Sequence, residues 1–131
     1  MTIAVGDSAS RTRTITDADI AAFAVASGDE NPVHTDATYA ATTRFGRPIA
    51  HGMLTASLIS AVLGNDLPGP GSVYLSQTLS FKAPVYPGDT VTALIECVKY
   101  REDRKIATFR TTVTNQDGVL VLEGEAVILA S

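Results

Sequence analysis

Two short segments of the sequence hold groups that can do chemistry together. Residues 27–34 read Ser-Gly-Asp-Glu-Asn-Pro-Val-His and place Asp29 and His34 five positions apart. Gly28 and Pro32 predict an irregular path for this stretch, because neither residue favours the interior of a regular helix. An aspartate and a histidine held close together can share one water molecule and exchange protons with it. The segment therefore predicts a pair of residues that activates water.

The second segment is His51-Gly52-Met53, which opens a long apolar run. We predict a helix over residues 52–63, and the first N–H groups of a helix have no partner within it. The amide of Gly52 is therefore predicted to bind an oxyanion, helped by the helix dipole and by the lack of a side chain. A polarised water opposite an oxyanion site suits the addition of water to an activated double bond, or the hydrolysis of an ester.

The composition is that of one globular domain. The chain has 131 residues, of which 45% are apolar and 18% are charged, as expected for a folded protein with a single core. We therefore predict a single domain over residues 1–131. The net charge of −4 and the scattered basic residues argue against a nucleic-acid partner, because phosphate binding needs clustered lysine and arginine.

The sequence also indicates a compartment. Cys97 is the single cysteine, so no internal disulfide can form, and its alternating apolar neighbours predict a buried thiol. The chain does not open with a basic region followed by a long apolar run, and the apolar residues 53–63 are too few to cross a bilayer. We expect a cytoplasmic protein without a membrane partner.

Capping residues predict the elements that hold the first segment in place. Thr16 fits the N-cap of a helix, Asp19 completes a capping-box pair with it, and Gly28 fits the end of that helix. Asp29 is thus expected in a loop just past a helix. A further short helix is predicted up to about residue 43.

The rest of the sequence predicts what covers the helix over residues 52–63. Apolar residues fall on nearly every face of this helix, so we expect protein all around it. Strands are predicted over residues 10–15, 72–83, 91–100, 105–114 and 119–129. These elements predict an α+β hot-dog fold, in which a curved antiparallel sheet of about five strands wraps around the central apolar helix, with an overhanging helical segment. The open sheet edge makes a homodimer the expected assembly.

Three motifs follow one another along the chain. They are residues 27–34, the run Arg-Pro-Ile-Ala-His-Gly-Met at 47–53, and the run Leu-Ser-Phe-Lys-Ala-Pro-Val at 79–85 with Gly-Asp at 88–89. Together they resemble the MaoC-like (R)-specific enoyl-CoA hydratases, and among these the small bacterial enzymes that supply polyhydroxyalkanoate synthesis. The resemblance extends from about residue 5 to the C-terminus.

This resemblance implies reversible syn addition of water to trans-2-enoyl-CoA, which gives (R)-3-hydroxyacyl-CoA. It also implies an acyl-CoA substrate, a hot-dog homodimer, and neither a metal nor another cofactor. Asp29 and His34 would be the catalytic pair, and Gly52 would bind the thioester oxyanion. Ser60 would lie beside the acyl chain.

The length of the acyl chain depends on side-chain volumes at the end of its pocket, which we predict to be formed by Ser60, Leu63 and Val127. Other functions remain open for the same class of ligand. A hot-dog thioesterase uses a carboxylate and a helix N-terminus, but has no need of an Asp–His pair on one loop. A dehydratase of acyl-carrier-protein substrates runs the same chemistry in reverse, although an acidic chain disfavours an acidic carrier. A non-catalytic acyl-CoA-binding subunit would be expected to have lost Asp29 or His34.

Overall fold

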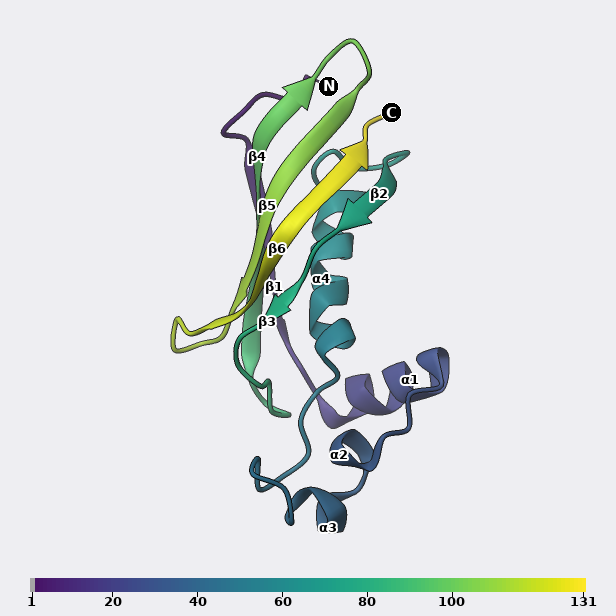
Figure 1. The fold of residues 1–131 in the computed structure, drawn as a ribbon, viewed down its shortest axis with the longest axis vertical. Coiled ribbons are helices and arrows are strands. Elements are labelled where there is room, and N and C mark those ends of the chain that lie inside the picture. The colour runs from purple at the N-terminus through teal and green to yellow at the C-terminus, as the bar shows by residue number, and fades with distance from the viewer. Residues whose placement is uncertain (1) are drawn as a thin grey trace.

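The computed structural model describes residues 2–131, which form a curved sheet, a long helix against it and a group of shorter helices (Figure 1). The helices are α1 (Asp17–Ser27), α2 (Pro32–Thr35), α3 (Ala37–Ala40) and α4 (Gly52–Asn65). The strands are β1 (Ser8–Thr14), β2 (Val73–Gln77), β3 (Ser80–Phe81), β4 (Thr90–Arg101), β5 (Ile106–Thr114) and β6 (Leu120–Leu129). Most of the helices precede most of the strands, and the predicted α+β class is confirmed.

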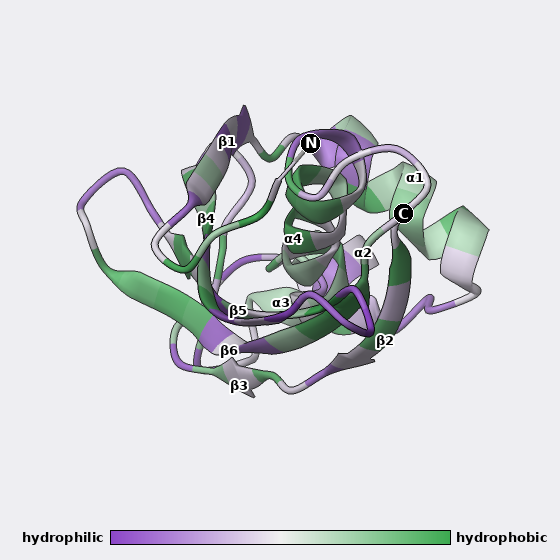
Figure 2. Cartoon of the chain, turned by 90° about the horizontal axis from the view of Figure 1, so that it is seen from above, coloured by the Kyte–Doolittle hydropathy of each residue, from purple (hydrophilic) through white to green (hydrophobic). Residues whose placement is uncertain are grey.

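The sheet is antiparallel throughout, and its strands follow the order β1-β4-β5-β6-β2, with β3 also paired to β6. Figure 2 shows the sheet curving around α4 from β1 on one side to β2 on the other. Buried residues alternate with half-buried or exposed ones along β4 and β5, because successive side chains of a strand point to opposite faces. The inward set is apolar, so the concave face buries α4 and the predicted hot-dog arrangement is present.

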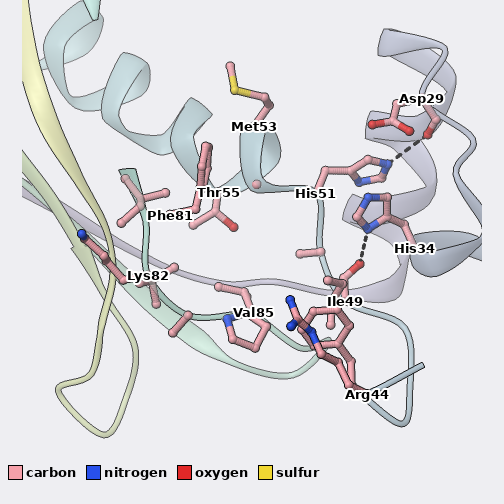
Figure 3. A pocket seen from close by; sticks show the side chains of 17 residues that line it. Asp29, His34, Arg44, Ile49, His51, Met53, Thr55, Phe81, Lys82 and Val85 are labelled. Atoms are coloured by element: carbon pink, nitrogen blue, oxygen red, sulfur yellow. Dashed lines mark hydrogen bonds between the residues drawn. The ribbon is translucent and has the colours of Figure 1, made fainter. Parts of the chain in front are cut away.

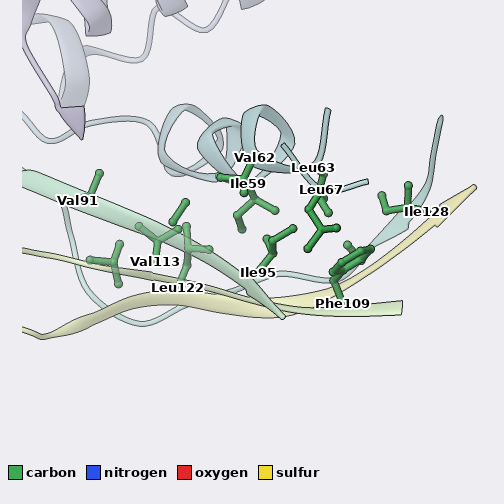
Figure 4. Close-up of a cluster of buried hydrophobic side chains, with 14 of the residues drawn as sticks. Ile59, Val62, Leu63, Leu67, Val91, Ile95, Phe109, Val113, Leu122 and Ile128 are labelled. Atoms are coloured by element: carbon green, nitrogen blue, oxygen red, sulfur yellow. The ribbon is translucent and has the colours of Figure 1, made fainter. Parts of the chain in front are cut away.

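The core lies between α4 and the concave face of the sheet (Figure 4). The helix contributes Ala56, Ile59, Val62 and Leu63, and the strands contribute Val91, Ile95, Phe109, Val113, Leu122 and Ile128. Cys97 is buried in β4, as predicted, and this burial raises the pKa of its thiol. No helix formed by residues 2–131 has both the length and the apolar character needed to cross a membrane.

The single chain covers only one side of α4, so the expectation of protein all around this helix is met on the side of the sheet alone. Met53, Ser57 and Ser60 are exposed on the face turned away from the sheet. The two serines interrupt the apolar run at positions three residues apart, so they share one helix face and leave it without apolar partners.

The helices α1, α2 and α3 form the overhanging segment, called the overhang below, and its first helix begins as the capping residues predict. The Thr16 side chain accepts a hydrogen bond from the amide of Asp19, and the Asp19 carboxylate accepts one from the amide of Thr16, so the capping box is present. Gly28 ends α1 in the left-handed conformation with φ of 78°. Asp29 therefore follows the helix directly, in a loop.

The irregular path predicted through His34 is wrong, because residues 32–35 form the one-turn helix α2. Pro32 occupies its start, where a missing N–H costs nothing, and the Asn31 side chain accepts a hydrogen bond from the amide of Val33. The next helix, α3, is capped by Asp36 and ends at Ala40, short of the predicted residue 43.

The strand predicted over residues 72–83 is two strands, β2 and β3, so the sheet has six strands instead of about five. The register of β2 shifts between Tyr74 and Ser76, and the chain then passes very close to β6. A Cβ atom at Gly124 would lie only 1.8 Å from the carbonyl oxygen of Thr78. This close approach leaves room for no side chain at residue 124, and pairing resumes only at Ser80.

Candidate active site

A cavity of about 510 Å³ opens where the overhang meets the N-terminus of α4 and the segment that follows β3 (Figure 3). Its polar lining comes from Asp29, His34, Arg44, His51, Thr55 and Lys82. Its apolar lining includes Phe45, Ile49, Ala50, Met53, Phe81, Val85, Val121 and Leu122. The cavity thus pairs an apolar wall, suited to an acyl group, with one cluster of acid–base side chains.

Asp29 reaches the cavity from the loop after α1. Its amide donates to Ser27 Oγ at 3.1 Å, and its Oδ1 accepts a hydrogen bond from the amide of Asn31 at 3.2 Å. These local bonds follow from the Ser-Gly-Asp-Glu-Asn order, because short polar side chains bond to the backbone two residues away. The other carboxylate oxygen accepts no hydrogen bond from residues 2–131, and this leaves it available to water.

His34 reaches the cavity from α2. Its Nδ1 lies 2.7 Å from the carbonyl oxygen of Ile49. Because a carbonyl can only accept, Nδ1 carries the proton and Nε2 of the neutral ring keeps its lone pair. One backbone contact to the segment before α4 therefore sets both the orientation of the ring and the nitrogen that can take a proton.

The structure brings the two predicted residues together, and it adds a third. A carboxylate oxygen of Asp29 and one ring nitrogen each of His34 and His51 all lie within 4.8 Å of one another. Two hydrogen bonds through one water span about 5.6 Å at most, so a single water can contact both Asp29 and His34. The proximity predicted from the sequence is present.

His51 is buried and packs against other side chains of the site. The residue is 2% exposed, and its Nε2 lies 3.0 Å from the backbone carbonyl oxygen of Asp29. Its ring stacks on that of His34, with centroids 4.0 Å apart, and contacts Phe23 at 4.8 Å. The sequence has no direct sign of these contacts, which join residues far apart along the chain.

The N-terminus of α4 has no side-chain cap. His51 holds the N-cap position but makes no capping hydrogen bond, and Gly52 is the first helical residue. The Gly52 position is exposed at the cavity, and a Cβ atom there would lie 2.7 Å from Cε1 of Phe81. The uncapped amides and the missing side chain are what the predicted oxyanion site requires.

The cluster of Asp29, His34 and His51 also has the residue types of a divalent-metal site. In both rings, however, one nitrogen donates to a backbone carbonyl, and Nδ1 of His51 is fully buried without a hydrogen-bond partner. Binding a metal through His51 would break the bond to the Asp29 carbonyl or expose a buried atom. The arrangement fits acid–base chemistry on water better than metal ligation.

Two basic side chains stand at the cavity, Arg44 and Lys82. The Arg44 guanidinium lies 5.1 Å from the ring centroid of Phe45, whereas Arg47 turns away to stack on Tyr86 at 4.0 Å. The sequence alone does not single out Arg44 or Lys82, because exposed basic residues near turns are common. That both line one cavity depends on the tertiary structure.

The residues predicted to end the acyl pocket do not line this cavity. Ser60 is exposed on the open face of α4, Leu63 is 2% exposed in the core, and Val127 lies on β6. Leu63 lies eleven positions after Gly52, and this corresponds to about 16 Å along a helix. Their contact with an acyl chain remains a prediction.

Comparison with known proteins decides the family. A family model described as "MaoC like domain" matches residues 4–119. The chain belongs to this MaoC-like domain family. Its fold is the family's fold, and the sequence-based resemblance is confirmed.

Individual MaoC-like proteins are also very similar to this chain. An "(R)-specific enoyl-CoA hydratase" of Aeromonas caviae is 53% identical over 124 residues, which cover 95% of this chain and 92% of that protein. A "3-hydroxybutyryl-CoA dehydratase" of Methylorubrum extorquens is 49% identical over 114 residues, covering 87% of this chain and 72% of that protein. The solved structure described as "(R)-hydratase from A. caviae involved in PHA biosynthesis" superimposes with a TM-score of 0.96 at 51% identity, covering 99% and 98% of the two chains.

Proposed function

We propose that this protein is an (R)-specific enoyl-CoA hydratase, which adds water reversibly to trans-2-enoyl-CoA and forms (R)-3-hydroxyacyl-CoA. The observation that carries the proposal is the placement of Asp29 and His34 within reach of one water, beside the uncapped N-terminus of α4. The names of the relatives that cover nearly the whole chain support it.

The proposed chemistry begins at the thioester. C3 of an enoyl thioester becomes electrophilic when charge moves onto the thioester oxygen. The Gly52 amide, at the uncapped start of α4, is the proposed donor to that oxygen. Asp29 accepts one proton of the water while the water oxygen bonds to C3. That proton passes from Asp29 to the unprotonated Nε2 of His34, which delivers it to C2. Neither residue is consumed, and the elements of one water are added. Because both groups act from one side through one water, the addition is syn.

The proposed substrate is a coenzyme A thioester with a short acyl chain. Arg44 and Lys82 place positive charge at the cavity, where the phosphates of coenzyme A would need it. The relative named for 3-hydroxybutyryl-CoA supports a four-carbon chain as the first probe. Ser60, Leu63 and Val127 stay the proposed residues for the far end of longer chains.

The proposed assembly is a homodimer. Strand β2 is an edge of the sheet and exposes Val73, Tyr74 and Leu75, whereas the opposite edge strand, β1, presents Arg11 and Arg13. Exposed apolar residues on an unpaired edge favour association with another chain, and a second copy at β2 would also cover the nearby open face of α4. Light scattering after size-exclusion chromatography tests this: a monomeric mass would refute the dimer.

We further propose that the protein works in the cytoplasm and that its product supplies polyhydroxyalkanoate synthesis. The free thiol of Cys97 is compatible with a reducing compartment. The similarity to the Aeromonas caviae hydratase, whose structure is described as involved in PHA biosynthesis, supports the link to the polymer. Loss of polymer from fatty-acid-grown cells after deletion of the gene would support this role, and unchanged polymer content would refute it.

The assay is the incubation of the protein with crotonyl-CoA. Loss of the enoyl absorbance without release of free thiol indicates a hydratase, whereas free thiol indicates the thioesterase alternative. Turnover of crotonyl-acyl-carrier protein in place of crotonyl-CoA would indicate the dehydratase alternative.

Variants of the catalytic pair assign the chemistry to this cavity. Asp29→Asn and His34→Ala are each expected to lower kcat by about 100-fold or more, the usual loss for a general acid or base. Asp117→Asn is the matched control, because Asp117 is exposed in the β5–β6 hairpin outside the cavity. Near-normal turnover in either site variant would remove that residue from the mechanism.

A further inference from the structure

His51 contacts both members of the proposed catalytic pair, yet it stands outside the reaction itself. Its Nε2 bonds to the backbone of Asp29, and its ring lies flat against His34. We propose that His51 is a positioning residue, which fixes the Asp29 loop and the His34 ring relative to each other and to the start of α4. The inference rests on the proposed hydratase function and deepens it.

The hydrogen bond fixes the tautomer of His51. The carbonyl of Asp29 can only accept, so Nε2 carries the proton and Nδ1 keeps the lone pair. The Nδ1 atom is buried and has no hydrogen-bond partner within residues 2–131. The ring of His51 is almost fully buried, and its one N–H already donates a hydrogen bond to the Asp29 carbonyl. It therefore cannot exchange protons with a substrate water, and this separates His51 from the catalytic pair.

The ring stack explains why the residue is a histidine. Phe23 of α1 and His34 of α2 both contact the ring of His51, which precedes α4, so one side chain connects three helices. A flat aromatic ring meets the packing requirement, and an N–H at its far edge meets the requirement of the Asp29 carbonyl. Phenylalanine would supply the aromatic ring without the N–H, and glutamine would supply an N–H without the ring.

The same orientation keeps the oxyanion site open. A side chain at the N-cap position usually accepts a hydrogen bond from an amide of the first turn, as Thr16 does for α1. His51 is turned toward Asp29 and makes no such bond. The first amides of α4 are therefore left for the thioester oxygen, while the loop that carries Asp29 is held beside them.

Two variants separate the contacts. His51→Phe keeps the stack and removes the donor, and it is expected to lower kcat for crotonyl-CoA by about 100-fold, the loss typical of a misplaced catalytic group. The KM for crotonyl-CoA should stay within about threefold, because neither variant touches the proposed coenzyme A contacts. His51→Gln keeps an N–H donor of similar reach and should recover kcat to within about tenfold of the unaltered protein.

A control separates positioning from loss of stability. Ile59→Val removes one buried methyl group from α4, the helix that His51 precedes, at a position that does not line the cavity. It should lower Tm without changing kcat. Retention of full kcat by His51→Phe would overturn the inference, and so would a folded His51→Gln that is as slow as His51→Phe. Absence of hydratase activity in the unaltered protein would instead refute the proposed function.

The tautomers themselves give a test that needs neither variants nor activity. The chain has two histidines, so ¹⁵N chemical shifts of the ring nitrogens can be assigned to each ring. We expect a protonated Nε2 for His51 and a protonated Nδ1 for His34 at neutral pH. A protonated Nδ1 on neutral His51 would show that the bond to Asp29 is absent, and the proposed positioning role would be wrong.

Discussion

Replacement of Gly52 by alanine gives the sharpest test of the oxyanion site. The added Cβ atom would lie 2.7 Å from Cε1 and 3.0 Å from Cδ1 of Phe81. Ordinary carbon contacts begin near about 3.5 Å, so the ring must move by roughly 1 Å. Phe81 is 52% exposed and sits on a strand of two residues, so its ring can turn toward solvent.

The expected effect on stability is therefore small. Alanine restricts the unfolded chain more than glycine does, which stabilises the fold by about 0.4–1 kcal/mol and offsets much of the cost of moving an exposed ring. We expect Tm to change by less than about 4 °C.

The expected effect on catalysis is large. The methyl group lies beside the Gly52 amide that the thioester oxygen must approach, and loss of one oxyanion donor lowers kcat by about 10²–10³-fold. Initial rates with crotonyl-CoA, with Tm measured on the same samples, make the comparison.

A second variant identifies which group obstructs the thioester. Gly52→Ala combined with Phe81→Leu relieves the contact with the ring but keeps the methyl group beside the amide. The double variant should remain slow if the methyl group itself blocks the approach. Unchanged kcat in folded Gly52→Ala would refute the role of this amide.

Further outcomes follow from other contacts. The hydrogen bond from Arg13 lowers the pKa of Asp19, so this ion pair stabilises the fold above the carboxyl's usual pKa, and the effect is lost as pH falls through the lowered value. The free energy of unfolding of Arg13→Gln, measured with urea from about pH 7 to about pH 2, should fall below that of the unaltered protein by less than about 1 kcal/mol at neutral pH and equal it in acid. A difference that stays constant with pH would contradict this. Gly124→Ala should cost about 3 kcal/mol or more, because its Cβ would meet the Thr78 carbonyl at 1.8 Å, and a Tm equal to that of the unaltered protein would disprove the close approach. Leu63→Ala should lower the free energy of unfolding by about 2–5 kcal/mol, because Leu63 lies in the core. If Leu63 also ends the acyl pocket, this variant should raise turnover of octenoyl-CoA relative to crotonyl-CoA, and an unchanged ratio removes Leu63 from the substrate site.

Local signals in the sequence specified the parts of the site that depend on near neighbours. Three such features each involve residues within a few positions of one another. They are the capping box of Thr16 and Asp19, the left-handed end of α1 at Gly28, and the helix start at Gly52. Their residue types restrict the backbone directly, so the elements that carry Asp29 could be predicted without the fold.

The same kind of reasoning failed where two local preferences compete. Pro32 disfavours a helix interior but suits a helix start, and only the packing of the overhang selects the one-turn helix that carries His34. The apolar content of α4 predicted protein on all sides of this helix, and the single chain supplies it on one face.

Residue types and their order along the chain were enough to indicate which groups could do the chemistry and which elements carry them. How these groups meet depends on the folded chain: the ring of His51 against His34, the His34 proton held by Ile49, and Arg44 facing the cavity. These contacts join segments separated by loops and helices, and their geometry depends on the packing of the whole chain. A sequence pattern records neighbours along the backbone, while a catalytic site is made of neighbours in space.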